Sequence, residues 1–395
     1  MKLLFVHDVK ALVSKGEVYA RSYGIKTWNR YLSCFDSILV CARSREVTEK
    51  VTKGIEQLTS ERVSFDNRIG MFCGPEVFFK RNTKKCLYED IQKSDAVILR
   101  LDSFLGLLAA RYCRKNKVPY IIEVVGCAWD SFWNHGLSGK IIALPLFMMM
   151  KKEVRKSKYC IYVTKDFLEK RYPTKGTFTN ISNVSLTNIS EDDLLSRIAK
   201  IQNHRTNTDV INLATVANVG VRYKGMHFVI KALGLLKKKG HTNFRYHMIG
   251  EGNQEYLKKI ASKCGVLNMI EFHGPMRHED VFEFLKNNTD IYIQPSLQEG
   301  LPRALIEAMS VALPCLGSNV AGIPELLNKD CIFDKTKNKE KQIADLLLSM
   351  SCEKMLFYAK VNYENSLCYS EDLLQNRRVS FIKKFINEEN RQNER

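Results

Sequence analysis

Short apolar segments rich in β-branched residues alternate along this chain with longer segments of helical periodicity. In the first half, helices are predicted at Phe104–Asn116 and Phe147–Ser157. Strands are predicted before and between them at Lys2–His7, Ser37–Ala42, Ala96–Leu101, Pro119–Val125 and Tyr159–Thr164. Alternating strands and helices are typical of βαβ units, in which the strands form a parallel sheet. The first half of the chain is therefore predicted to be an α/β domain.

The same alternation starts again near Val210, after a polar segment. The second set of predicted strands is Val210–Val216, Phe244–Ile249, Ile270–His273, Asp290–Gln294 and Pro314–Gly317. A length of 395 residues also exceeds what one ordinary hydrophobic core holds. We predict a first domain at 1–190, a linker at 191–209 with room for a short helix, a second α/β domain at 210–365 and a C-terminal helical segment at 366–395.

A formal net charge of +18 and a pI near 9.3 show that the chain attracts polyanions. No zinc-finger spacing or RRM pattern is present, so nucleic acid is not the expected partner. The apolar stretch Ile141–Met150 precedes a group of cations, an arrangement that suits docking on an anionic membrane. A buried helix with a solvated end is the alternative. The cations are Lys151, Lys152, Arg155, Lys156 and Lys158.

Cysteine spacing and hydropathy indicate where the protein resides. The twelve cysteines are scattered, and the closest pair, Cys34 and Cys41, has six residues between them. Reduced thiols in the cytosol are therefore expected, with neither a disulfide framework nor a cysteine zinc site. The apolar run at Met1–Val6 is too short for a signal peptide, and no run is long enough to span a membrane. We predict a cytoplasmic protein associated peripherally with the inner face of the membrane.

Two carboxylates, Glu299 and Glu307, lie eight residues apart across the end of a loop and the start of a predicted helix. Pro302 suits the first turn of that helix, where a missing N–H costs nothing. Free N–H groups at a helix start hold anions such as a diphosphate. A carboxylate on each side of that anion can bind hydroxyls at both ends of one molecule. A nucleotide sugar has this layout, because its diphosphate lies between the hydroxyls of the sugar and those of the ribose.

Glu299 to Glu307, followed by Ala308-Met309 and by Gly322-Ile323-Pro324-Glu325-Leu326, resembles the E-x7-E signature of retaining glycosyltransferases of family 4. The resemblance covers most of residues 210 to 335 and, more weakly, the first half. It implies the GT-B fold, in which two Rossmann-like domains face each other across a cleft and the last helix crosses back to the first domain. Bacterial surface-polysaccharide glycosyltransferases, including those of capsule and lipopolysaccharide synthesis, are the implied relatives.

The resemblance also implies the reaction. A hexose-type sugar would move, with retention, from a UDP- or GDP-linked donor to a hydroxyl of a lipid-linked glycan. Glu299 would position the sugar, Glu307 the ribose, and Lys224 the diphosphate. The family's arginine position holds Val219 here, so Arg222 would supply that charge from a rearranged loop. Further donor contacts are expected from Gly250, Gly252, Pro275, Arg277, Gly300, Leu301 and Pro302.

The first domain is expected to bind the acceptor. A long polar loop at His7–Gly24, which includes Asp8, follows the first strand. A second segment places Trp129 beside a carboxylate, a common sugar platform. Asp130 is the first choice to orient the acceptor hydroxyl and His135 the second, whereas a core tryptophan and a helix-capping aspartate are the alternative. His273, in the second domain, is expected to be structural.

No metal and no cofactor are expected. The acidic run Glu191–Asp193 follows no predicted strand, so it lacks the context of the D-x-D metal site of GT-A enzymes. A G-x-G-x-x-G pattern is absent, which argues against a dinucleotide oxidoreductase. Two alternatives stay open: a nucleotide-sugar epimerase of the same fold, and a non-catalytic scaffold that binds polyanions.

Overall fold

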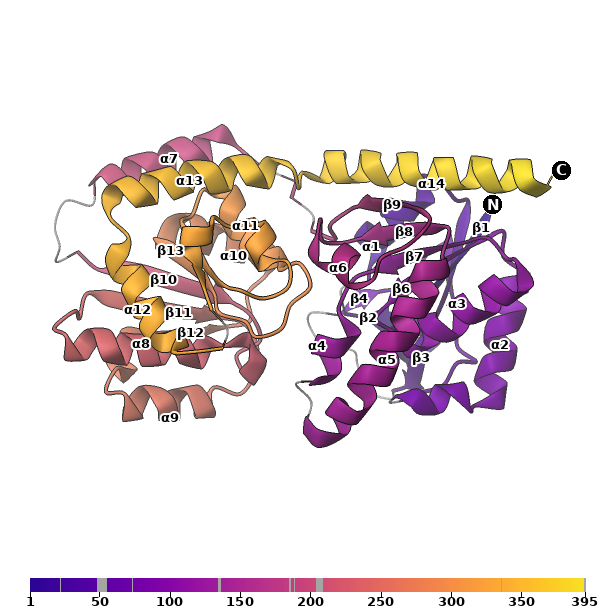
Figure 1. Ribbon diagram of the computed structural model, residues 1–395, viewed down its shortest axis with the longest axis horizontal. Helices are drawn as coiled ribbons and strands as arrows, with labels where there is room; N and C mark the ends of the chain where they lie inside the picture. The colour runs from indigo at the N-terminus through magenta and orange to yellow at the C-terminus, as the bar shows by residue number, and fades with distance from the viewer. Residues whose placement is uncertain are drawn as a thin grey trace. The chain divides into compact units, whose positions relative to one another are not determined.

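The computed structural model describes residues 1–21, 23–47, 55–72, 74–133, 136–184, 186–187, 189–203, 209–334 and 336–393. The chain forms two compact units (Figure 1). Unit 1 contains Met1–Ile181 and Leu374–Arg395, and unit 2 contains Ser182–Leu373. In the described part of the chain, no helix is both long enough and apolar enough to cross a membrane.

Unit 1 is built on a sheet whose main part is parallel, with the strand order β5-β3-β1-β6-β7-β8-β9. The order runs outward in both directions from β1 and β6, which is a doubly wound topology. All six residues of β6 are buried, as expected for a strand covered on both faces. The strands are β1 Lys2–Ser14, β2 Glu17–Ala20, β3 Ser37–Glu46, β4 Glu56–Gln57, β5 Val63–Asp66, β6 Ala96–Leu101, β7 Tyr120–Val124, β8 Tyr159–Tyr162 and β9 Thr177–Asn180.

The prediction of a loop at His7–Gly24 is wrong, because most of these residues belong to strands β1 and β2. Strand β1 continues to Ser14 and pairs with β2 in an antiparallel hairpin. Lys15 and Gly16 form its turn with φ of 51° and 84°, the left-handed pair that a two-residue hairpin needs. Polar residues inside the strand hide this hairpin in the sequence, and the Lys-Gly pair is the signal that was missed.

Helices pack around the sheet of unit 1. Helix α3 contacts β1 and β6 and lies between α2 and α5 (Figure 1). Helix α14 joins this unit from Leu374 onward; the Tyr159 hydroxyl donates to Glu388 at 2.6 Å, and Gln375 donates to the Arg30 carbonyl at 3.0 Å. The helices are α1 Ile25–Leu32, α2 Arg81–Gln92, α3 Phe104–Asn116, α4 Ala128–Trp133, α5 Gly136–Lys156, α6 Phe167–Arg171 and α14 Glu371–Asn393, with the 3-10 turn η1 at Pro75–Phe78.

Unit 2 has an all-parallel sheet with the order β12-β11-β10-β13-β14-β15. Numbered from its own first strand, this is the 3-2-1-4-5-6 order of the Rossmann fold. Two Rossmann-like units confirm the predicted fold class. The strands are β10 Ile211–Val216, β11 Phe244–Ile249, β12 Ile270–Gly274, β13 Ile291–Gln294, β14 Cys315–Ser318 and β15 Ile332–Phe333.

Two groups of helices cover the sheet of unit 2 (Figure 1). Helix α8 packs with α9 and α12, whereas α11 packs with α10 and α13. The helices are α7 Glu191–Asn203, α8 Met226–Lys238, α9 Glu255–Lys263, α10 His278–Asn288, α11 Arg303–Ser310, α12 Lys339–Ser349 and α13 Cys352–Leu367. Short 3-10 turns occur at η2 Arg222–Lys224, η3 Leu267–Met269, η4 Ile323–Glu325 and η5 Lys329–Cys331.

The segment expected to be a linker contains helix α7, which packs on α13 within unit 2. Its buried positions are Asp193, Arg197 and Ile201, at the i, i+4, i+8 spacing of one helix face. Arg197 donates to the carbonyl oxygens of Leu285 and Thr289 at 3.0 and 2.6 Å. Two of the three buried residues are charged, so the segment has the composition of a linker although it packs as a helix. Residues 204–208 of the predicted linker lie outside the described residues.

Candidate functional site

The loops after β10 and β13 meet where the strand order of unit 2 reverses. Lys224 ends the turn η2 after β10, and Glu299 lies in the loop after β13. The Lys224 ammonium and the Glu299 Oε1 are 2.6 Å apart. Ligands of open α/β sheets bind at such a switch point, beyond the carboxyl ends of the strands. The structure therefore brings together two of the residues that the sequence singled out.

One oxygen of Glu299 is held by three donors. Besides Lys224, the Ser296 hydroxyl and the Gln294 amide donate to Oε1 at 2.6 and 3.0 Å. The Tyr292 hydroxyl donates to Gln294 Oε1 at 2.8 Å, which fixes the orientation of that amide. In the part of the chain that the structure describes, Glu299 Oε2 accepts no hydrogen bond. A carboxylate held in this way is rigid and keeps one oxygen for a ligand hydroxyl.

Glycines let the neighbouring loops approach one another closely. A Cβ on Gly225 would lie 1.8 Å from the Pro295 carbonyl oxygen, and one on Gly250 would lie 2.0 Å from that of Ala217. A Cβ on Gly252 would meet the Gly220 nitrogen at 2.4 Å. All three glycines have φ between 76° and 144°, a range that favours glycine. Gly250 and Gly252, predicted as donor contacts, therefore have at least a structural reason to be glycine.

Arg222 and Lys224 have different neighbours. The guanidinium carbon of Arg222 lies 5.6 Å from the centre of the Tyr256 ring on α9, whereas Lys224 contacts Glu299. Val219, at the position of the family's arginine, is buried. The structure thus places Lys224 against the Glu299 carboxylate and Arg222 against the Tyr256 ring of α9. A phosphate-binding role for Arg222 remains a prediction.

Glu307 lies in the second turn of α11, and its carboxylate is 3.2 Å from His278 Nε2. Pro302 precedes the first residue of α11, as the sequence predicts. Gly300 accepts a hydrogen bond from the Gly322 N–H at 2.9 Å, which ties the loop before α11 to the loop after β14. His278 was missed by the sequence analysis, because nothing in its local sequence connects it with Glu307.

Other predicted donor contacts lie at the surface of unit 2. Pro275 is exposed and Leu301 is half-buried. Arg277 forms two 2.8 Å hydrogen bonds with Asp280, in the first turn of α10. Its guanidinium is thereby occupied by its own helix.

Unit 1 has a polar cluster at its own switch point, between β1 and β6. The Asp8 carboxylate accepts from the N–H groups of Phe104 and Leu105 at 2.8 and 3.1 Å, and so caps α3. Burial raises the pKa of Asp8 to about 6. Asp102 accepts a hydrogen bond from the Ser131 hydroxyl, and burial raises its pKa as well. Asp102 was missed, although a carboxylate directly after a central strand is a usable signal.

The tryptophan segment lies in α4, the helix whose Ser131 donates to Asp102. The rings of Trp129 and Trp133 stack with their centres 4.7 Å apart. Asp130 Oδ1 lies 3.9 Å from an Arg171 Nη, too long for a hydrogen bond. Trp133 is 41% exposed, and the Lys140 ammonium lies 5.2 Å from the centre of its ring. His135 lies outside the described residues.

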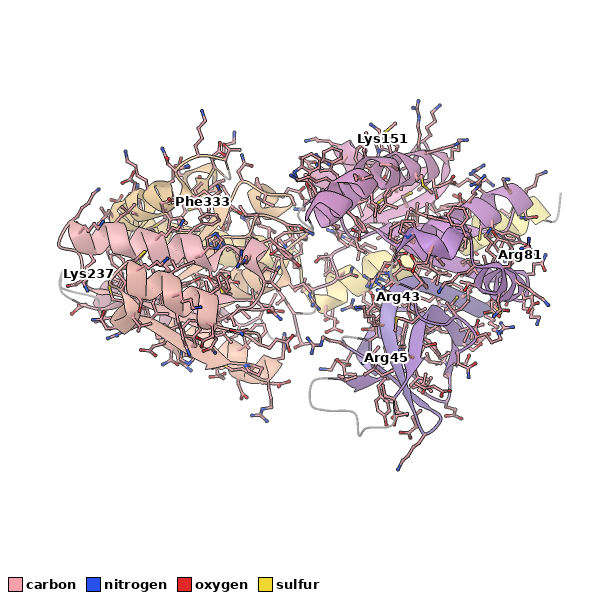
Figure 2. All side chains as sticks on the ribbon, turned by 90° about the horizontal axis from the view of Figure 1, so that it is seen from below. Arg43, Arg45, Arg81, Lys151, Lys237 and Phe333 are labelled. Atoms are coloured by element: carbon pink, nitrogen blue, oxygen red, sulfur yellow. The ribbon has the colours of Figure 1, made fainter. Side chains whose placement is uncertain are left out.

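Helix α5 has an exposed face that is apolar at one end and cationic at the other. Ile141, Leu144 and Met148 are 76%, 53% and 56% exposed. Lys152 and Arg155 follow at intervals of four and three residues, so they continue the same face. Figure 2 labels Lys151, which lies beside this face with its ammonium 5.7 Å from the Phe147 ring. Ala143, Leu146 and Met150 are buried, so α5 packs one face in unit 1 and exposes the other, and docking of the exposed face on a membrane remains a prediction.

Two successive doubly wound α/β units, the second with a glycine-lined, lysine-bearing switch point, are the features of the GT-B class of glycosyltransferases. A model of the family described as glycosyl transferases group 1 matches residues 197–360. Protein CapJ of Staphylococcus aureus is 34% identical over 340 residues, which cover 84% of this chain and 82% of CapJ. The chain therefore belongs to the group 1 glycosyltransferases, family 4, and has the GT-B fold.

Two further comparisons agree with this assignment. The amylovoran biosynthesis glycosyltransferase AmsK of Erwinia amylovora is 38% identical over 111 residues, 26% of this chain and 27% of that protein. Among solved structures, Alr3699/HepE of Anabaena in complex with UDP has a TM-score of 0.67 at 14% identity and covers 97% of this chain and 100% of its own. That likeness concerns the fold.

The close approach at Gly225 generates a prediction. Alanine at Gly225 should cost more than the roughly 1–2 kcal/mol of a left-handed residue, because its Cβ meets the Pro295 carbonyl. Gly240→Ala is the matched control, since Gly240 has φ of 88° and nothing within 4 Å of its Cβ. Urea unfolding should show the larger loss for Gly225→Ala. Equal losses would mean that the loop moves freely away from Pro295.

Proposed function

We propose that this protein is a retaining glycosyltransferase that moves a hexose-type sugar from a UDP- or GDP-linked donor to a hydroxyl of a lipid-linked glycan, in surface polysaccharide synthesis. The 2.6 Å pair of Lys224 and Glu299 at the switch point of unit 2 carries this proposal. The names of AmsK, a biosynthetic glycosyltransferase, and of HepE, solved with UDP and with UDP-glucose, support the substrate class.

In this mechanism Glu299 binds sugar hydroxyls through Oε2 and Glu307 binds the ribose. Lys224 neutralises the charge that grows on the diphosphate as the bond from the sugar carbon to the phosphate oxygen breaks. The acceptor oxygen forms the new bond on the same side of the sugar, and its proton passes to the departing phosphate oxygen. The cation and the free N–H groups at the start of α11 supply positive charge, so this step needs no metal ion.

Unit 1 binds the acceptor in this proposal. Asp8, at the switch point of unit 1, lies at the carboxyl end of the strands, where polar ligand groups bind in such sheets. Trp129 supplies an aromatic face for a sugar ring, and Asp130 and His135 are the candidates to orient the attacking hydroxyl. Gly250, Gly252, Pro275, Arg277, Gly300, Leu301 and Arg222 complete the proposed donor contacts.

Calorimetric titration with UDP, GDP and ADP tests the donor proposal. Glu307→Gln should weaken binding of the preferred nucleotide by roughly 1–3 kcal/mol, because a charged acceptor for the ribose hydroxyls is lost. Glu279→Gln, on exposed surface of α10, is the control and should bind as the parent does. Failure of all three nucleotides to bind would contradict the function itself, and an unchanged affinity in folded Glu307→Gln would contradict only the ribose role.

Lys224→Ala separates binding from catalysis. Its turnover number should fall more than its donor affinity, because additional negative charge develops on the diphosphate in the transition state as the sugar–phosphate bond breaks. The measurement is kcat together with the dissociation constant of the donor, with exposed Lys259→Ala as the control. Equal losses of kcat and affinity, or no loss of either, would count against this transition-state role of Lys224, and a loss of affinity with unchanged kcat would show that it serves ground-state binding alone.

We further propose that the protein acts in the cytoplasm, docked on an anionic membrane face through α5. Its exposed apolar residues can enter the interface while the cations contact lipid phosphates. A hollow of about 400 Å³ at the end of α5 has Arg155, Lys156, Lys158 and Lys175 in its lining, so several cations gather there. Lys158 also pairs with Glu389 at 3.4 Å, which offsets part of this charge.

Replacing the five cations of this region with Ser or Gln should release the protein from anionic vesicles, because each cation near the surface contributes about 1 kcal/mol. Vesicle sedimentation measures the bound fraction, which should also fall steeply with salt. The control removes five lysines from unit 2, among them Lys237 on α8 (Figure 2), and leaves the patch intact. Equal release by both variants would indicate that net charge, not this helix, governs binding. The replaced cations are Lys151, Lys152, Arg155, Lys156 and Lys158, and the control lysines are Lys237, Lys238, Lys239, Lys258 and Lys259.

A further inference from the structure

Two histidines and a glutamate gather on one face of the unit 2 sheet. His247 of β11 lies directly opposite Glu271 of the parallel edge strand β12. His273 follows Glu271 by two residues, so its side chain points to the same face of β12. One ligand atom from each residue lies within 4.8 Å of the others. None of the three belongs to the proposed donor or acceptor contacts.

Hydrogen bonds from Asp290 through Asn212 to His247 Nε2 leave the lone pair of His247 Nδ1 directed into this cluster. The Asp290 carboxylate can only accept hydrogen bonds, so the Asn212 side chain must present its amide nitrogen to it, and the Nδ2–Oδ2 distance is 3.1 Å. Its Oδ1 then faces His247 Nε2 at 3.1 Å and requires an N–H there. The other nitrogen of His247, Nδ1, is therefore unprotonated in the neutral ring. An imidazole that donates its outer N–H to a fixed oxygen is the usual arrangement behind a metal ligand.

The distances among the three ligand atoms fit a small tetrahedral ion. His247 Nδ1 lies 3.0 Å from His273 Nε2 and 3.4 Å from Glu271 Oε2. His273 Nε2 lies 3.9 Å from the same oxygen. Atoms bound at about 2.0–2.1 Å to tetrahedral zinc are separated by about 3.3–3.4 Å. Shifts of about half an ångström in side chains would thus complete three corners of a tetrahedron.

Packing and charge around the cluster favour a site that is both ordered and reachable. The Phe284 ring of α10 packs against both imidazoles, at 5.4 and 4.7 Å between ring centres. His247 is buried, whereas the side chains of His273 and Glu271 are 22% and 47% exposed. Arg245 lies 3.7 Å from Glu271 Oε1, the oxygen that does not face the imidazoles.

We propose that His247, Glu271 and His273 bind a zinc-class divalent ion that joins β11 to the edge strand β12. Two nitrogens and one carboxylate oxygen form a ligand set that zinc accepts, with water as the fourth ligand. The ion would hold the end of β12, and with it the Gly274–Arg277 turn, against β11. The proposal is independent of the transfer reaction, which uses residues of other loops.

Zinc titration of the metal-stripped, full-length protein tests the proposal. The parent should bind one more equivalent of Zn²⁺ than His273→Gln, and Zn²⁺ should raise the thermal midpoint of the parent more than that of His273→Gln. Asn212→Ala, which removes the hydrogen bond behind His247, should weaken zinc binding about 10–100-fold. Exposed His241→Gln is the control, and it should keep the full stoichiometry. Comparison with variants is needed because the exposed thiols Cys352 and Cys368 also attract zinc.

Cobalt supplies a readout of geometry, since the visible absorption of Co²⁺ strengthens in a tetrahedral site. Parent protein should show this absorption, and Glu271→Gln should diminish it. Glu271 is 47% exposed, so this variant should stay folded, which circular dichroism checks. Identical zinc stoichiometry and cobalt spectra in the parent, His273→Gln and Glu271→Gln would overturn the proposal. The histidines would then share only a hydrogen bond.

Discussion

The reversal of strand order between β10 and β13 is the constraint on which the arrangement of Lys224 and Glu299 in unit 2 depends. At this point the loops that follow two neighbouring strands leave in opposite directions, and a space opens beyond the strand ends. Lys224 comes from one loop and Glu299 from the other, so their contact exists only because β10 and β13 pair. Gly225 allows the first loop to approach Pro295 of the second. The contact between Lys224 and Glu299 thus depends both on the pairing of β10 with β13 and on the absence of a side chain at Gly225.

Charge in this protein is costly wherever it is buried, and the structure compensates it with specific partners. In unit 1, Arg100 is enclosed with Glu123 at 3.1 Å and with the Tyr23 hydroxyl at 2.8 Å. In unit 2, the partly buried Lys224 is matched by Glu299. Such pairs contribute little net stability, but the loss of one partner is strongly destabilising. A diphosphate that approaches Lys224 would offer a second anion to a cation already held in position.

The surfaces outside the switch points have chemistry that local sequence only partly reveals. On α5 the apolar residues and the cations are adjacent in sequence, and helical periodicity places them on one face. The histidine and glutamate cluster differs, since His247 and Glu271 are 24 positions apart and meet through the register of β11 and β12. Helix α9 lies between β11 and β12 in the sequence, so its length sets the number of residues between His247 and Glu271. A search for metal ligands at short sequence intervals therefore misses this cluster.

Local patterns of the sequence determined the elements whose signals are complete within a few residues. The helix Phe104–Asn116 and the strand Ala96–Leu101 have the predicted bounds, because an apolar run followed by a serine cap is a local signal. The motif from Glu299 to Glu307 likewise identifies a loop and a helix start.

Only the tertiary structure decided which distant residues meet. Tertiary packing buries the charged face of α7 and brings His278 to Glu307. It also places Asp102 at the switch point of unit 1 and the two histidines beside Glu271. Burial of a polar group becomes favourable only when a partner from another element satisfies it, and no local sequence pattern specifies that partner.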